Sequence, residues 1–153
     1  MIVSPKDATP SFCLRLPTTP LATRMARRTV RAFAARVGFA GERLDEIELA
    51  VAESCANAVI HSVPDGEGTF EVTSILCGDA IIVSILDTGV GVPGARESTG
   101  LGLGIPLITA LADDVSFGTP AAGGTEVRMA FFVGSQAGRT ISPARIRPPV
   151  ADV

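Results

Sequence analysis

Lysine, histidine and cysteine are scarce in this chain, and each scarcity excludes a class of site. Lys6 is the only lysine, so the chain has no Walker A phosphate loop, which needs a lysine directly after a glycine. His61 is the only histidine, and Cys13, Cys55 and Cys77 are widely spaced. We therefore expect neither a closed zinc site nor a disulfide framework, and interpret the cysteines as buried free thiols in a reducing compartment.

Long apolar runs are also missing. No run approaches the roughly 18 residues needed to span a bilayer, and the first ten residues lack the basic and then apolar pattern of a signal peptide. We therefore expect a cytoplasmic protein. The chain has 153 residues, of which 46% are hydrophobic, which fits one domain with a real core. Its net charge of −3 argues against non-specific nucleic-acid binding.

Two long helices are predicted in the first half of the chain. Thr19 is a good N-cap, Pro20 suits a first helical position and Gly38 suits a helix stop, so a helix should run from Pro20 to Val37. A second helix should cover residues 42–61. The apolar positions at helical spacing are Ala26, Val30, Phe33 and Val37 in the first helix and Leu44, Ile47, Val51 and Cys55 in the second. Four arginines should lie away from the buried face of the first helix: Arg24, Arg27, Arg28 and Arg31.

The remaining pattern predicts strands and one shorter helix. The expected strands cover residues 11–16, 69–77, 80–86, 115–117 and 126–133, and a third helix covers 105–112. Gly78 and Asp79 should close a tight hairpin between the second and third strands. This order is not a regular alternation of strand and helix, so we expect an α+β fold, a two-layer sandwich with helices on one face of a mixed, mostly antiparallel sheet. The domain should span 11–133, between a flexible segment, 1–10, and a disordered tail, 134–153.

Glu53 and Asn57 are the first candidate site residues. They lie four residues apart on the second predicted helix and therefore share a face, which differs from the apolar one. Asn57 offers an oxygen to Mg²⁺, and Glu53 could take a proton from an attacking hydroxyl or water. An exposed Glu/Asn pair on a helix is also commonplace, so a solvated face is the better interpretation of this pair taken by itself.

Asp87 ends an apolar strand and is followed at once by Gly89 and Gly91. The carboxylate can accept a hydrogen bond from an exocyclic amine, and the glycines let the backbone approach a flat ring. A simple Asp-Gly turn is the alternative.

A second glycine cluster precedes the third predicted helix, where Gly100, Gly102 and Gly104 alternate. Backbone N–H groups at a helix N-terminus form an anion site, although a hinge loop would use the same residues. Residues 89–94 (GVGVPG) also match a dinucleotide-binding fingerprint. We reject that match because the preceding strand belongs to a hairpin and no helix with an apolar face follows.

Taken in order, these segments resemble the GHKL (Bergerat-fold) ATPase superfamily. The N-box corresponds to residues 53–57 (ESCAN), the G1 box to 87–91 (DTGVG), the G2 box to 100–104 (GLGLG) and the closing motif to 123–125 (GGT). Within the superfamily the chain looks most like the bacterial anti-sigma-factor serine/threonine protein kinases, whose first helix is similar to residues 26–33 (ARRTVRAF).

The resemblance implies a role for each matching residue. Asp87 would bind the adenine amino group with help from Thr125, Asn57 would hold Mg²⁺, Glu53 would be the general base for a partner's serine hydroxyl, and Arg27 would reach the phosphate and the partner. The other implied nucleotide-binding residues are Gly89, Gly91, Gly100, Leu101, Gly102, Leu103 and Gly104. The implied ligands are ATP and Mg²⁺, and the implied partners are a sigma factor, an anti-anti-sigma-like protein and a second copy of the chain.

One departure from the family pattern leaves an alternative open. Only eight residues, 92–99, separate the two glycine motifs, where these kinases have a longer ATP lid. A short lid puts closure over the phosphates in doubt. The alternative function is therefore a non-catalytic module that sequesters its partner in a nucleotide-dependent way.

Overall fold

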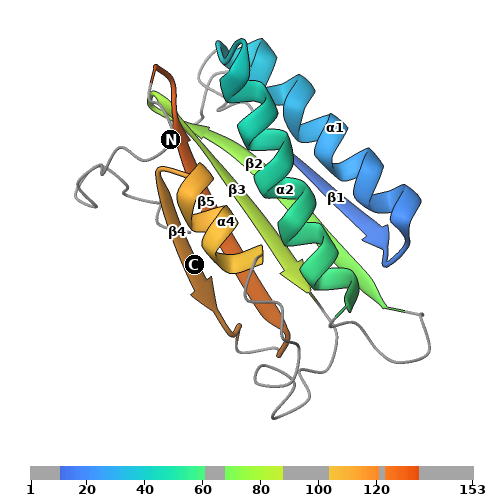
Figure 1. The fold of residues 1–153 in the computed structure, drawn as a ribbon. Helices are drawn as coiled ribbons and strands as arrows, with labels where there is room; N and C mark the ends of the chain where they lie inside the picture. Colours follow the sequence, from blue (N-terminus) through green and yellow to red (C-terminus); the bar gives the residue numbers. More distant parts are fainter. Residues whose placement is uncertain (1–10, 61–67, 88–103, 121–122, 135–153) are drawn as a thin grey trace, which may run out of the picture.

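The computed structural model describes residues 11–60, 68–87, 104–120 and 123–134. These residues form one five-stranded sheet with three helices packed on the same face (Figure 1). The predicted two-layer α+β sandwich is thus confirmed, and every pair of neighbouring strands is antiparallel. The expectations for 1–10 and for the tail beyond Gly134 lie outside the described residues.

Helix α1, Pro20–Val37, has the bounds that its end signals predict. The Thr19 hydroxyl accepts a hydrogen bond from the Ala22 N–H at 3.2 Å, which satisfies one donor of the first turn. Gly38 ends the helix at a φ of 117°, a conformation that favours glycine. The buried stripe is Ala22, Ala26, Val30 and Ala34. Phe33 and Val37, which were predicted to be buried, lie at its margin and are only partly covered.

Helix α2, Glu42–Ile60, turns back beside α1. Its predicted apolar stripe is largely correct, since Ile47, Val51 and Cys55 are buried and Leu44 is partly buried. Arg43 and Ser54 are buried with them, which the apolar pattern did not indicate. His61 lies outside the described residues.

The sheet has the strand order β1-β2-β3-β5-β4. β2, Thr69–Cys77, and β3, Ala80–Asp87, form the predicted hairpin, with Gly78 at a φ of 62° in the turn. β1, Ser11–Pro17, and β4, Asp114–Gly118, are the two edge strands, and β5, Thr125–Phe132, pairs with both β3 and β4. Helix α4, Gly104–Leu111, begins one residue earlier than predicted.

The main core lies between the sheet and the helices. Alternate residues of β3 and β5 point into it, and they are Ile81, Val83, Ile85, Val127, Met129 and Phe131. A smaller buried cluster on the opposite face is formed by Ala80, Ile82, Ala130 and Phe132. Cys13 is exposed because it points outward from an edge strand, so the prediction of a buried thiol is wrong for this residue. None of the described helices combines the length and apolarity needed to cross a bilayer.

Candidate functional site

Asp87 lies at the end of β3 as the last residue of the row that faces the helices. Its neighbours in that row, Val83 and Ile85, are fully buried, and Asp87 itself is only 5% exposed. The strand register places Thr125 directly opposite Asp87 on β5 and Phe70 directly opposite on β2. The two residues that the sequence assigned to adenine recognition, 38 positions apart in the chain, are therefore cross-strand neighbours.

Glu53 and Asn57 lie on the part of α2 nearest this end of the sheet (Figure 1). Both are partly buried. They follow Glu46 and Ala50 by seven residues, or two helical turns, and so return to the same side of α2. Arg43 bonds both Glu46 and α4, so this is the side of α2 that faces α4. The pair is therefore not on a fully solvated face.

The beginning of α4 completes this end of the molecule. Gly104 starts the helix, and Figure 1 shows that start at the same end as the last turns of α2 and the end of β3. The other glycine-motif residues predicted to bind nucleotide lie outside the described residues, as does the predicted short lid, 92–99. They are Gly89, Gly91, Gly100, Leu101, Gly102 and Leu103.

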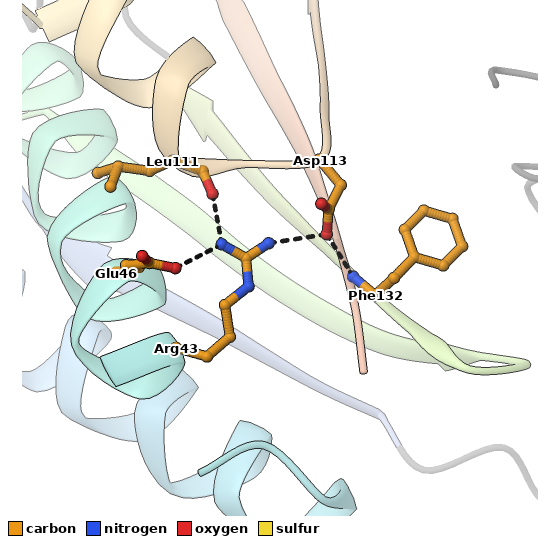
Figure 2. A network of polar contacts seen from close by, with 5 residues as sticks. All are labelled: Arg43, Glu46, Leu111, Asp113 and Phe132. Carbon is orange, nitrogen blue, oxygen red and sulfur yellow. Dashed lines mark hydrogen bonds and ion pairs between the residues drawn. The ribbon is translucent and has the colours of Figure 1, made fainter. Parts of the chain in front are cut away.

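A buried ionic network fixes α2 and α4 at the opposite end (Figure 2). The Arg43 side chain, 8% exposed, donates to Glu46 Oε2 at 2.7 Å, to the Leu111 carbonyl at 2.6 Å and to Asp113 Oδ2 at 2.7 Å. The Asp113 side chain is 1% exposed, and its Oδ2 also accepts a hydrogen bond from the Phe132 N–H at 2.7 Å. One guanidinium thus joins α2, the end of α4 and the segment leading into β4, and helps to set the spacing of α2 and α4.

The same guanidinium lies over an aromatic ring, with its carbon 5.2 Å from the centre of the Phe131 ring. Sequence reasoning missed this network. The available signal was an arginine at helical spacing with Ile47, Ala50 and Ser54, within a stripe that is otherwise small or apolar.

Arg27 is not brought to Glu53. Its Nη1 lies 3.8 Å from Glu48 Oε1, on the side of α2 that faces α1. Glu48 and Glu53 are five residues apart, so their side chains leave α2 about 140° apart around its axis. Arg31 shares Glu48, with Nη1 2.8 Å from Oε2 and 2.6 Å from Asp45 Oδ1. The hydrogen bond to Asp45 is the main cause that raises the pKa of Arg31 above its ordinary value.

Two further observations limit the chemistry of the described residues. Cys55 lies inside α2 near the site, and burial raises the pKa of its thiol to about 12, so it remains protonated at neutral pH. Within the described ranges, no three His, Cys, Asp or Glu side chains gather in a way that could hold a metal ion.

Comparison with known proteins identifies the family of this chain. Residues 16–131 match the model of the histidine kinase-like ATPase domain. This match extends from β1 to β5 and includes each described element that contributes to the site. It therefore covers Asp87, Thr125, Glu53 and Asn57 together.

Similar proteins include anti-sigma F factors and RsbW serine-protein kinases. An anti-sigma F factor of Thermoanaerobacter sp. (strain X514) is 26% identical over 121 residues, covering 72% of this chain and 85% of the relative. A serine-protein kinase RsbW of Oceanobacillus iheyensis is 30% identical over 118 residues, covering 67% and 75%.

A crystal structure of the RsbU and RsbW domains of a Mycobacterium tuberculosis protein is also similar, with a TM-score of 0.64 and 26% identity. The similarity covers 88% of this chain and 35% of that longer one. The chain therefore belongs to the histidine kinase-like ATPase domain family, in the group that contains the anti-sigma F factors and the RsbW serine-protein kinases.

Proposed function

We propose that the chain is an ATP-dependent serine protein kinase of the anti-sigma-factor type, which phosphorylates an anti-anti-sigma-like partner and sequesters a sigma factor in the cytoplasm. The observation that carries the proposal is the buried carboxylate of Asp87 at a strand end, directly across from Thr125 and at the same end of the molecule as the last turns of α2. Family membership supports ATP as the nucleotide.

Asp87 would recognise the adenine ring. Its carboxylate accepts hydrogen bonds only, which suits the exocyclic amine of adenine and opposes the carbonyl at the same position of guanine. Because the carboxylate is buried, a nucleotide that leaves it without a donor would carry a desolvation penalty. Thr125, which is partly buried, would add a hydroxyl from the neighbouring strand.

Asn57 and Glu53 would act on the phosphate side of the nucleotide. Asn57 would supply an amide oxygen to Mg²⁺, which when bound neutralises charge on the phosphates. Glu53 would accept the proton of a partner's serine hydroxyl as the serine oxygen forms a bond to the γ-phosphorus. The bond between that phosphorus and the ADP oxygen breaks, and ADP leaves with its electrons. One turn of helix holds both side chains, so their spacing is fixed before a ligand binds.

Arg27 would contact a docked partner protein rather than act beside Glu53. Its contact with Glu48 is long, at 3.8 Å, and Glu48 is also held at shorter distance by Arg31. Arg27 could therefore leave Glu48 for an anionic group of a docked partner at small cost.

A homodimer through β1 is part of the proposal. β1 is an edge strand, which leaves backbone groups available for pairing with another strand. A hollow of about 450 Å³ lies beside it between β1 and α1, lined by apolar residues that include Phe12, Phe33 and Val37. The residues that line the hollow come from β1 and α1 and include none of the predicted nucleotide-binding residues, so we assign it to association rather than to nucleotide binding.

Partner capture followed by a transfer assay tests the kinase proposal. Proteins retained by the tagged chain with and without Mg-ATP are purified and incubated with the chain and γ-labelled ATP. We expect phosphoserine on one retained partner and its loss with Asn57→Ala. With Glu53→Gln we expect the transfer rate to fall by about 100-fold or more at unchanged ATP affinity. ATP-dependent retention with no label on any retained protein would contradict the kinase and favour the non-catalytic module.

A further inference from the structure

Four of the five arginines of α1 fall into two sets that the sequence alone did not separate. The helix contains no acidic residue. Arg27 and Arg31 face α2 and form ion pairs with its acidic side chains. Arg24 and Arg28 are exposed, and no ion pair or hydrogen bond of either side chain is recorded within the described part of the chain.

Two large apolar side chains lie on the same outward face. Leu21 is 65% exposed and Met25 is 51% exposed. Leu21, Met25 and Arg28 follow one another at four- and three-residue spacing, and Arg24 lies beside them, so all four occupy one side of the helix. The buried stripe of α1 lies on the opposite side. We call these four residues the Leu21 face.

We propose that the Leu21 face is a docking surface for an acidic amphipathic helix of a partner protein. Leu21 and Met25 would bury against apolar residues at positions i, i+4 and i+7 of that helix, and methionine adapts readily to the shape of its partner. Arg24 and Arg28 would pair with glutamate or aspartate beside those residues. This inference deepens the proposed function, and it rests on that function only in requiring a protein partner.

Charge favours such a partner over two other occupants. A second copy meeting this face through a two-fold axis would place arginines opposite arginines, which repel. A membrane surface requires a broad apolar helix face, and the Leu21 face offers only two apolar side chains while the opposite side of α1 is packed on the sheet. An acidic helix satisfies both the charge and the small apolar area.

Fluorescence anisotropy with a labelled 18-residue helical peptide tests the proposal. The peptide carries leucines at i, i+4 and i+7 flanked by glutamates, and a control peptide has the same composition with the leucines dispersed around the helix. We expect Leu21→Ser to weaken binding about 10-fold at any salt, and Arg28→Glu to weaken it about 10-fold at low salt and less at high salt. The matched control is Arg128→Glu, which reverses a charge on β5, on the sheet face opposite the helices, and should have little effect.

A peptide in which lysine replaces the glutamate that pairs with Arg28 should restore binding to Arg28→Glu. Equal binding of both peptides, an equal loss with Arg128→Glu, or no peptide binding would overturn the proposal. It would also be overturned if Leu21→Ser abolished self-association in sedimentation experiments or binding to phosphatidylglycerol vesicles. ATP affinity is measured in parallel, so a chain that binds the peptide through this face but not ATP would refute the proposed kinase and retain the docking surface.

Discussion

Arg43→Met removes the cation from the most deeply buried ion pair among the described residues while keeping a long apolar side chain against Phe131. Asp113, 1% exposed, then loses its guanidinium partner, and the Leu111 carbonyl loses a donor. Breaking a buried pair by removing one member typically costs 3–5 kcal/mol. We expect a value near the lower end, about 3 kcal/mol, because the Phe132 N–H still donates to Asp113.

Urea denaturation followed by far-ultraviolet circular dichroism measures this loss. The chain has no tryptophan or tyrosine, so intrinsic fluorescence would report poorly on unfolding. The matched control is Arg31→Met, which removes ion pairs with Asp45 and Glu48. The Arg31 side chain is 36% exposed, so this variant should change stability much less. Adding Asp113→Asn to Arg43→Met should recover stability, since the amide oxygen can still accept from Phe132 without leaving a buried charge.

The size of the decrease in the free energy of unfolding shows whether the Arg43 network acts as a buried ion pair. A decrease below about 1 kcal/mol for Arg43→Met would be that of an exposed ion pair and would refute the reasoning. So would a double variant less stable than Arg43→Met alone. ATP affinity should also fall in Arg43→Met, because the network holds together α2 and α4, whose other ends lie at the same end of the molecule as the end of β3.

Four further outcomes are expected. Ser74→Ala should stabilise the fold by about 1 kcal/mol in the same urea assay, because the Ser74 hydroxyl is fully buried and has no hydrogen-bond partner in the described part of the chain; a loss of stability would show that the hydroxyl is satisfied. In native protein at pH 8, a thiol reagent should label Cys13 and spare Cys55 until denaturant is added. The raised pKa of Cys55 makes stability fall as pH rises from 9 toward 12, since only the unfolded thiol ionises there, and Cys55→Ala should flatten that fall. Glu53→Gln should leave ATP affinity within twofold in calorimetry and slow transfer to a partner about 100-fold, and equal rates would remove Glu53 as the base.

Local signals predicted the elements well because each acts over a few residues. Thr19, Pro20 and Gly38 define both ends of α1, and Gly78 with Asp79 defines the β2–β3 turn. The resemblance indicated that Asp87 and Thr125 act together, and the strand register supplies the physical reason, since β3 and β5 pair directly.

Long-range pairing could not be predicted in the same way. The burial of Arg43 depends on Asp113, 70 residues away, and nothing near Arg43 in the sequence indicates that partner. The arginines of α1 looked like one charged face, and only the position of Glu48 on α2 divides them into paired and unpaired sets. The glycine-motif residues lie outside the described residues, so their role in phosphate binding stays a prediction.

Titration of Mg-ATP into the wild-type chain and Asp87→Asn by calorimetry tests the central claim most directly. Asp114→Asn, an exposed aspartate on β4, is the matched control. We predict that Asp87→Asn weakens ATP binding by about 1–3 kcal/mol, or roughly 5- to 150-fold, and that Asp114→Asn leaves it unchanged. Unchanged ATP affinity in a folded Asp87→Asn variant would contradict the assignment of this strand end as the nucleotide site.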